Sequence, residues 1–219
     1  MAIGPKLKWI KSQLEDKIYL ISFLIISILL AFLVLKNFNQ NILINTILIS
    51  SALYLFFITL RDFFVKKYKN ISQNIAHFGF SLLILSILFN NILASEIITN
   101  LKVVETFENS KTKIVFESID QKKEKNYNAI IENFTISNLN CEEDRLSPEL
   151  RIYNQPVIAT SEADIKTTLM SDKFIVINLV QNQDFFNVRY QVKPFMLWIW
   201  LSVILISFAG IVSFLQKRS

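Results

Sequence analysis

The chain of 219 residues is poor in cysteine, histidine, glycine and proline, and each shortage excludes a class of protein. A single cysteine, Cys141, excludes an intramolecular disulfide, a CxxC redox pair and a cysteine-rich zinc site. A single histidine, His77, excludes any metal site that needs several histidines from this chain alone. Three glycines and four prolines exclude collagen-like, flexible-linker and proline-rich chains. A phosphate-binding loop and a Ser-His-Asp arrangement are also missing, so no complete enzyme active site is visible.

Apolar residues, in contrast, are abundant. They make up 52% of the chain, the mean hydropathy is +0.39, and charged residues are 19%, against about 25% in an ordinary soluble protein. Four stretches contain no Asp, Glu, Lys or Arg and are long enough to cross about 30 Å of hydrocarbon as helices. They are Ile18–Leu35, Ile42–Leu60, Ile75–Ala94 and Pro194–Leu215.

The distribution of charge predicts how these stretches are oriented. Residues 95–193 contain 12 basic and 15 acidic residues, net −3, whereas the rest of the chain contains 11 basic and 3 acidic residues, net +8. Basic residues concentrate before the first stretch, between the second and third, and after the fourth, which places these segments in the cytoplasm. This pattern indicates membrane orientation and not a nucleic-acid surface. The expected organisation is a cytoplasmic interfacial segment at 1–17, three transmembrane helices at 18–94 with a basic cytoplasmic loop at 61–72, a periplasmic or intermembrane-space domain at 95–193, a fourth transmembrane helix at 194–215, and a cytoplasmic tail at 216–219.

The 95–193 segment is predicted to be rich in β-strands. Residues 186–193 alternate between apolar and polar side chains, which is typical of a half-buried strand. Further strands are expected at Lys111–Ile119, Asn128–Ile136, Glu149–Tyr153 and Lys173–Val180, with polar turns at Gln121–Lys125 and Asn140–Asp144. Ser161–Leu169 is interpreted as a short helix, and Lys6–Gln13 as an amphipathic helix at the membrane interface.

The predicted fold class is therefore an α-helical membrane protein with four transmembrane helices. A small antiparallel β-rich periplasmic domain is inserted between helices three and four. The sequence shows no internal repeat of useful length.

His77 is the residue with the sharpest chemical meaning. At helical spacing its face includes Asn74 and Ser81. A neutral imidazole offers a nitrogen lone pair to iron, and its second N–H needs a partner such as Asn74 or Ser81 to fix the tautomer. Gly79 and Ala76 are small enough to let a flat macrocycle or another helix approach closely. The alternative is a structural histidine near the interface, hydrogen-bonded to a neighbouring helix.

Two tryptophans, Trp198 and Trp200, follow the Lys193-Pro194 dipeptide at the start of the fourth apolar stretch. Pro194 is expected in the first helical turn, where its missing N–H has no partner to lose. The tryptophans fit an aromatic belt at the membrane interface. The functional alternative is a platform near a haem or a partner helix.

Seven short motifs occur in order along the chain. They are AIGPKLKW at residues 2–9, IAHFG at 75–79, NYNA at 126–129, ELRIY at 149–153, SEADI at 161–165, SDKFIV at 171–176, and VRYQVKPF at 188–195 continuing to Trp198-Ile199-Trp200. Together they resemble the C-terminal part of CcmF, the haem-lyase subunit of the multi-subunit System I pathway of cytochrome c maturation.

The resemblance implies a b-type haem held in the membrane by two histidines on different helices. His77 matches the second of these ligands, with Asn74, Gly79 and Ser81 beside it as haem-binding residues. The first ligand is expected from an N-terminal CcmF portion, which also carries a tryptophan-rich motif and the remaining histidines. The chain is thus expected to be a split or truncated form of the family protein.

The activity implied by the resemblance is covalent attachment of haem to the CxxCH thiols of an apocytochrome c, with this chain not catalytically complete alone. The implied partners are the N-terminal CcmF portion, the haem chaperone CcmE, a CcmH-type thiol protein, apocytochrome c and membrane lipid, with no nucleic acid. The expected location is the bacterial inner membrane, or the mitochondrial inner membrane.

Two other functions fit the residues. In the first, the chain is a non-catalytic membrane scaffold whose periplasmic domain docks an assembly partner, and His77 is merely structural. In the second, less favoured one, it is a transporter subunit. Transporters place broken helices and polar residues at the membrane midplane, whereas His77 is shallow and no pair of apolar stretches is broken at matching positions.

Overall fold

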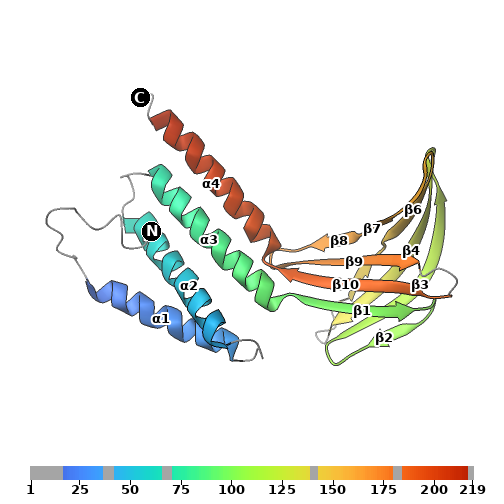
Figure 1. Cartoon of the computed structure of the whole chain (residues 1–219), viewed down its shortest axis with the longest axis horizontal. Helices are drawn as coiled ribbons and strands as arrows, with labels where there is room; N and C mark the ends of the chain where they lie inside the picture. Colours follow the sequence, from blue (N-terminus) through green and yellow to red (C-terminus); the bar gives the residue numbers. More distant parts are fainter. Residues whose placement is uncertain (1–16, 37–41, 66–70, 139–142, 180–183, 217–219) are drawn as a thin grey trace. The chain divides into compact units, whose positions relative to one another are not determined.

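The computed structural model describes residues 17–36, 42–65, 71–138, 143–179 and 184–216 (Figure 1). The chain divides into two compact units. One consists of residues 1–92 and 195–219 and contains the helices, and the other, Leu93–Pro194, contains the strands. The segment Lys6–Gln13, predicted to be an interfacial helix, lies outside the described residues.

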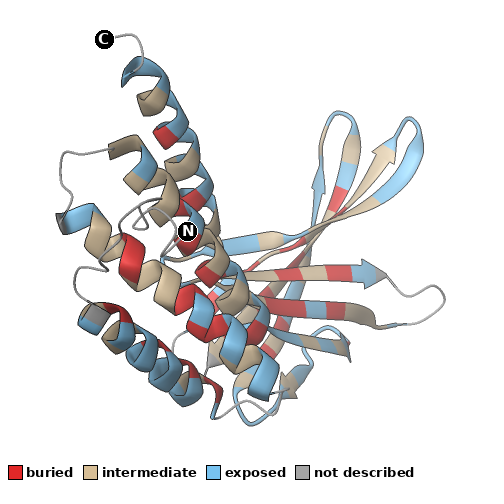
Figure 2. Cartoon of the chain, turned by 60° about the vertical axis from the view of Figure 1, so that its left-hand side comes forward, coloured by how far each residue is buried: buried red, intermediate tan, exposed pale blue. Residues whose placement is uncertain are grey.

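Four helices in the described part of the chain are long and apolar enough to cross a membrane, as predicted. Three precede the strands and one follows them. They are α1 Lys17–Leu35, α2 Ile42–Val65, α3 Ile71–Leu93 and α4 Met196–Gln216. Many large apolar side chains of α1, α2 and α4 are exposed, whereas on α3 only Phe80 and Ile87 are, and Figure 2 marks the exposed positions along the helices. Outward-facing apolar side chains are the arrangement that a lipid environment favours.

The second helix continues five residues beyond the predicted apolar stretch, which ended at Leu60. Arg61 and Asp62 lie within it, and their side chains approach each other to 3.9 Å. The Arg61 guanidinium also lies 3.7 Å from the centre of the Tyr19 ring on α1. The prediction ended this helix at the first charged residue. The helix continues because these two charged side chains have partners and lie near its end.

The ten strands of the second unit form two antiparallel sheets. Sheet A has the strand order β1-β10-β9-β8, and sheet B has the order β2-β3-β4-β6-β7, with β5 also paired to β4. The strands are β1 Ser95–Leu101, β2 Thr106–Glu108, β3 Thr112–Lys123, β4 Tyr127–Asn138, β5 Glu143–Leu146, β6 Glu149–Asn154, β7 Val157–Glu162, β8 Asp164–Thr167, β9 Ser171–Leu179 and β10 Phe186–Pro194. This confirms the prediction of an antiparallel β-rich unit.

The hydrophobic core of this unit is built from the inward faces of both sheets, with buried and exposed residues alternating along the strands (Figure 2). Phe116 on β3 stacks on Phe134 on β4 with ring centres 4.5 Å apart. Phe186 on β10 meets the Phe116 ring edge-on at 5.5 Å, which joins sheet A to sheet B. Such aromatic pairs contribute about 0.5–1.5 kcal/mol each beyond the area they bury.

The prediction of a short helix at Ser161–Leu169 is wrong. Its first two residues end β7, and Asp164–Thr167 form β8, which pairs with β9. Ile165 and Thr167 are β-branched, and such residues favour the pleated surface of a sheet. Pairing with β9 supplies the backbone hydrogen bonds that a helix would otherwise make internally.

Two predicted turns are also shorter than expected. Strand β3 continues to Lys123 and β4 begins at Tyr127, so residues 124–126 connect them, and only 124 and 125 of the turn predicted at Gln121–Lys125 remain outside the strands. In the second turn, predicted at Asn140–Asp144, Glu143 and Asp144 belong to β5, and residues 140–142 lie outside the described residues. Polar side chains extend into both strands because one face of each is exposed to solvent.

The junction between β10 and α4 also differs from the prediction. Pro194 is the last residue of β10, paired with Ser171, and not part of the first helical turn. Phe195 follows with φ of 60°, in the left-handed region, which is costly for a residue with a side chain. Its ring packs against Phe89 of α3 with centres 5.5 Å apart. This contact accompanies the sharp change from strand to helix.

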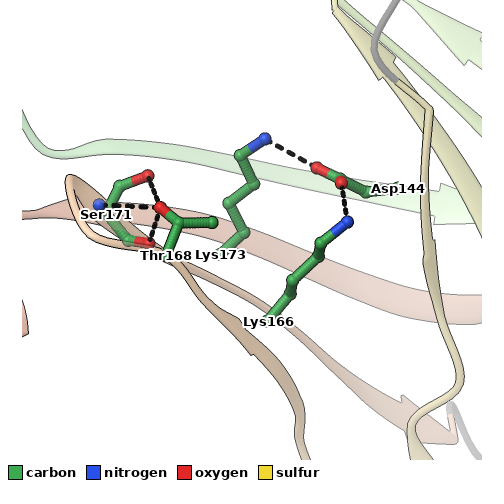
Figure 3. Close-up of polar contacts among 5 residues, drawn as sticks. All are labelled: Asp144, Lys166, Thr168, Ser171 and Lys173. Carbon is green, nitrogen blue, oxygen red and sulfur yellow. Dashed lines mark hydrogen bonds and ion pairs between the residues drawn. The ribbon is translucent and has the colours of Figure 1, made fainter.

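An ionic cluster also joins the two sheets (Figure 3). Asp144 on β5 of sheet B accepts hydrogen bonds from Lys166 on β8 at 2.5 Å and from Lys173 on β9 at 2.6 Å. Burial alone raises the pKa of Asp144, but the two lysine hydrogen bonds and charges outweigh it, and the pKa lies below its ordinary value. The paired carboxylate therefore holds the edge of sheet A to sheet B.

Candidate functional site

His77 lies six residues after the start of α3, so it is about 9 Å along the helix axis from Ile71. Its side chain is half-buried. Within the described part of the chain, neither ring nitrogen has a hydrogen bond or an ion pair. The expected hydrogen bond from a structural histidine to a neighbouring helix is therefore not among the described contacts. A half-buried imidazole without such a partner keeps a lone pair available for a ligand.

Asn74 and Ser81, the two residues predicted to fix the imidazole tautomer, have different surroundings. The Ser81 hydroxyl is fully buried and donates to the Phe78 carbonyl oxygen at 2.8 Å. It also lies 2.9 Å from the Thr59 hydroxyl on α2. Ser81 therefore connects α3 to α2. Asn74, one helical turn before His77, is half-buried and remains the nearer candidate for orienting the imidazole.

Gly79 is a position of close helix approach. A Cβ there would lie 3.0 Å from Ile206 Cγ1, 3.2 Å from Leu205 Cβ and 3.3 Å from the Ile206 backbone nitrogen. These atoms all belong to α4. Two residues along a helix turn by about 200°, so Gly79 faces away from the side of His77. Gly79 was predicted to allow close approach of either a flat macrocycle or another helix. In the structure, the neighbour at Gly79 is helix α4.

The neighbourhood of His77 on the α2 side is aromatic. Phe78 packs against Phe56 at 5.5 Å and against Phe63 at 6.1 Å between ring centres. Both partners lie on α2. The sequence analysis missed this cluster, although the phenylalanines at 56 and 63 repeat at the seven-residue spacing of one helix face. The cluster gives the space next to α3 a dry, apolar wall.

Trp198 and Trp200, the predicted platform residues, do not share one face of α4. Trp200 is 62% exposed, whereas Trp198 is half-buried and its carbonyl oxygen accepts a hydrogen bond from Ser202 at 2.6 Å. The two indoles point in directions about 200° apart around the helix. This arrangement suits a belt of interfacial aromatics better than a single flat platform.

The second unit contributes two groups of buried or paired polar side chains. Glu132 and Tyr190 are buried with side-chain oxygens that have no hydrogen-bond partner among the described residues. Burial raises the pKa of Glu132 to about 8 and that of Tyr190 to about 12. On the surface, hydrogen bonds from Gln191 and Arg189 lower the pKa of Glu96. Nothing here combines a nucleophile with a base.

No group of three or more His, Cys, Asp and Glu residues suited to a metal ion is found among the described residues. Among the described residues, the chain therefore offers a metal one imidazole, that of His77. A metal held with two axial protein ligands would require the second ligand from elsewhere. Among the described residues, His77 can therefore supply one of the two protein ligands of such a metal site.

Comparison with known proteins gives a family match for the second unit and a more distant match for the whole chain. Residues 92–194 match the family described as the CcmF C-terminal beta-sandwich. A cytochrome c-type biogenesis protein, ccl1 of Rhodobacter capsulatus, is 40% identical over 73 residues, which are 33% of this chain and 11% of that protein. The CcmF of Haemophilus influenzae is 23% identical over an alignment of 234 residues that covers all of this chain and 36% of that protein.

A solved structure gives the same result for the fold. The structure of a cytochrome c haem lyase CcmF has a TM-score of 0.66 and 16% identity, and the match covers 96% of this chain and 36% of that chain. The match includes both the helices and the strands, because it extends over nearly the whole sequence. This chain spans little more than a third of the length of the longer-matching relatives.

Proposed function

We propose that the chain is a CcmF-like protein corresponding to the C-terminal part of that family, and that it acts in cytochrome c maturation as one component of a membrane haem lyase. Its relatives are named for cytochrome c-type biogenesis, one of them aligns with the whole chain, and the fold resembles that of a solved CcmF over 96% of it. The proposed overall reaction adds each CxxCH thiol of an apocytochrome c across a haem vinyl group.

His77 carries the cofactor part of the proposal. We assign it as one axial ligand of a membrane b-haem, with a histidine of the N-terminal CcmF portion on the other side. The supporting observation is its half-buried imidazole, which has no hydrogen-bond partner among the described residues. A bound haem would supply one-electron chemistry, with a potential that depends on axial ligand and local polarity.

The neighbouring residues have supporting roles in this proposal. Asn74 orients the imidazole from one turn away. The Phe56, Phe63 and Phe78 cluster excludes water from the α2 side. Ser81 and Thr59 fix α3 against α2, which holds the His77 backbone in place, and Gly79 sets the contact with α4. Ser81 and Gly79 thus act by positioning the helix and not by touching the haem.

The proposed setting follows from the charge distribution. We place the basic segments 1–17, 61–72 and 216–219 in the cytoplasm and the β-sandwich on the other side of an inner membrane, in the periplasm. There the sandwich can meet the haem chaperone CcmE, a CcmH-type thiol protein and apocytochrome c. The N-terminal CcmF portion is the partner within the membrane.

Replacement of His77 by Ala tests the ligand assignment. The complex of this chain with the N-terminal CcmF portion is purified, and its visible absorption spectrum is recorded. We expect the Soret band to shift or disappear in His77→Ala, because one axial nitrogen is lost. Exogenous imidazole is expected to restore it in part. Cytochrome c carrying covalent haem is measured in the same cells.

A matched control is Gln73→Ala, which changes an exposed polar side chain one turn earlier on α3 and is expected to leave the spectrum unchanged. An unaltered spectrum in His77→Ala would reject the ligand role. Normal covalent haem attachment in cells that lack this chain would reject the maturation function itself. A chain that is needed for attachment but never co-purifies with haem would point to the scaffold.

A further inference from the structure

The hairpin between β8 and β9 carries two exposed large apolar side chains at its tip. Leu169 and Met170 are each 59% exposed. Tight turns usually place Gly, Asn, Asp, Ser or Pro at such positions, because these residues suit the backbone and tolerate water. Single exposed apolar residues are ordinary on a protein surface, and here two of them are adjacent at the tip of a hairpin.

The turn that carries these two residues is closed by hydrogen bonds between Thr168 and Ser171 (Figure 3). The Thr168 backbone N–H donates to the Ser171 carbonyl oxygen at 2.9 Å, and the Thr168 hydroxyl donates to the same oxygen at 2.7 Å. The Ser171 backbone N–H donates to the Thr168 hydroxyl oxygen at 3.1 Å. The backbone is therefore closed on both sides of the tip, with Leu169 and Met170 exposed between Thr168 and Ser171.

The strand register shows which end of the sandwich carries this tip. Ser171 pairs with Pro194, the last residue before the α4 junction. On the other side of β10, Val192 pairs with Ser95, two residues after the end of α3. The hairpin tip is therefore at the end of sheet A where the chain enters from one membrane-spanning helix and leaves to another.

The spacing along the strands gives the reach of the tip beyond the last strand pair. A strand advances about 3.3 Å per residue, so the tip reaches about 3–7 Å beyond the Ser171–Pro194 pair. On β10, only Phe195 separates Pro194 from Met196, the first residue of α4. The helix ends mark the boundary of the hydrocarbon layer, where apolar side chains on a polar backbone are stable.

We propose that the β8–β9 hairpin is a membrane anchor, and that Leu169 and Met170 insert into the interfacial layer of the bilayer on the side of the β-sandwich. The sandwich is then attached at three points: through α3, through α4 and through the hairpin tip. This third attachment limits how far the sandwich tilts about its two covalent connections. The proposal is independent of haem and of the maturation function.

The β6–β7 hairpin provides a matched control. Val157, just after its turn, is 82% exposed. Only Ala163 separates β7 from β8, and the Ser161 hydroxyl bonds to Asn178 near the far end of β9. Strands β7 and β8 therefore follow one another along the sandwich, as Figure 1 also shows, and Val157 lies at the end opposite to Met170.

The test uses the full chain in vesicles of phosphatidylethanolamine and phosphatidylglycerol. In a Cys141→Ser background, Met170→Cys and Val157→Cys are each labelled with an NBD fluorophore. We expect NBD at residue 170 to emit at shorter wavelength and to lose at least about half its intensity when doxyl-labelled lipid is added. NBD at residue 157 is expected to emit as in water and to be unaffected.

Further positions separate insertion from other causes. NBD at Leu169→Cys should behave like NBD at residue 170. NBD at Thr167→Cys, which lies in β8 and farther from the hairpin tip, should be quenched less by doxyl lipid. Labelled proteins are first shown to unfold at the same guanidinium concentration as the unlabelled parent. Equal behaviour at residues 170 and 157 would overturn the proposal. So would a blue shift at residue 170 that doxyl lipid does not quench and that appears only when another protein is added.

Discussion

Glu132 is a carboxyl group enclosed by the core of the β-sandwich. On β4 it shares the inward face with Phe134 and Ile136, and it is fully buried. Neither carboxyl oxygen has a hydrogen-bond partner among the described residues. Because an ionised carboxylate is poorly stabilised there, burial raises the pKa of Glu132 to about 8. The folded domain therefore holds this side chain as a neutral acid at neutral pH.

The protonated state of Glu132 predicts a pH-dependent stability. The unfolded chain releases the proton near its ordinary pKa of 4.5, whereas the folded chain holds it to about 8. The free energy of unfolding therefore falls as pH rises through this window, by about 1.4 kcal/mol per pH unit. Glu132→Gln removes this dependence, so its stability relative to the parent should rise by roughly 3 kcal/mol between pH 4.5 and pH 7. The free energy of unfolding of both proteins is measured at each pH by guanidinium unfolding of the full chain in micelles, followed by infrared absorption of the β-sheet.

A matched control for this prediction is Glu117→Gln on the adjacent strand β3. The Glu117 side chain is exposed and accepts a hydrogen bond from Thr135 at 2.6 Å. This variant is expected to keep the pH profile of the parent. If Glu132→Gln and the parent had parallel profiles between pH 4.5 and 8, the buried carboxyl would have to be solvated or ionised in the folded domain.

Part of this residue-scale information is present in the sequence. In the run Ile130 to Ile136, a glutamate stands in an apolar position of a period-two pattern, which marks it as buried once the strand is recognised. The surroundings of His77 are different. Its spacing to Ser81 is visible, but the bond from Ser81 to Thr59 depends on helix packing, which spacing does not fix.

At the scale of elements, the contact of α3 with α4 depends on Gly79. Replacing Gly79 with Leu would place side-chain atoms against the Ile206 backbone, which cannot rotate away. Overpacking of this kind costs about 1–3 kcal/mol. We therefore expect the melting temperature of the full chain in micelles to fall by several degrees, measured by fluorescence of the α4 tryptophans. The same substitution at Gly210, where nothing lies within 4 Å of an added Cβ, should leave it unchanged.

The two Gly variants must differ for this interpretation to stand. If Gly79→Leu and Gly210→Leu had equal melting temperatures, α3 and α4 would not be packed through Gly79. A loss in both would indicate a general effect of leucine on these helices. Because both positions lie in apolar helices, the comparison isolates the helix contact from the helix propensity of leucine.

The elements that the sequence predicted best are those that depend on composition alone. The four apolar helices follow from hydropathy, and β3, β4, β6, β9 and β10 follow from short-range alternation. Strands β1, β2 and β5 were not predicted. The short strands β7 and β8 were also missed, because their partners are β6 in one sheet and β9 in the other. That choice of partner, like the pairing of Pro194 with Ser171, is made by long-range contacts that no local pattern contains.

At the scale of the whole molecule, the two units differ in charge as well as in structure. The segment 95–193 carries a net charge of −3, and the remainder carries +8, with most of its basic residues next to the helices. Two helices lie between the first basic segment and 61–72, and two more lie between 61–72 and the last basic segment. Because each pair of spanning helices returns the chain to the same side, all three basic segments share one side in this orientation. The proposed orientation therefore puts the β-sandwich, which is one helix away from 61–72, on the other side of the membrane.

This orientation is testable with cysteines introduced on the two sides. In a Cys141→Ser background, Val157→Cys marks the sandwich and Asn70→Cys marks the loop between the second and third apolar stretches. A membrane-impermeant maleimide added to intact spheroplasts should label residue 157 at once, and residue 70 only after permeabilisation. Neither substitution removes a basic residue, so the signal that sets the orientation is kept. Labelling in the reverse order would require the basic segments to face the periplasm, and the sandwich could then no longer meet periplasmic partners.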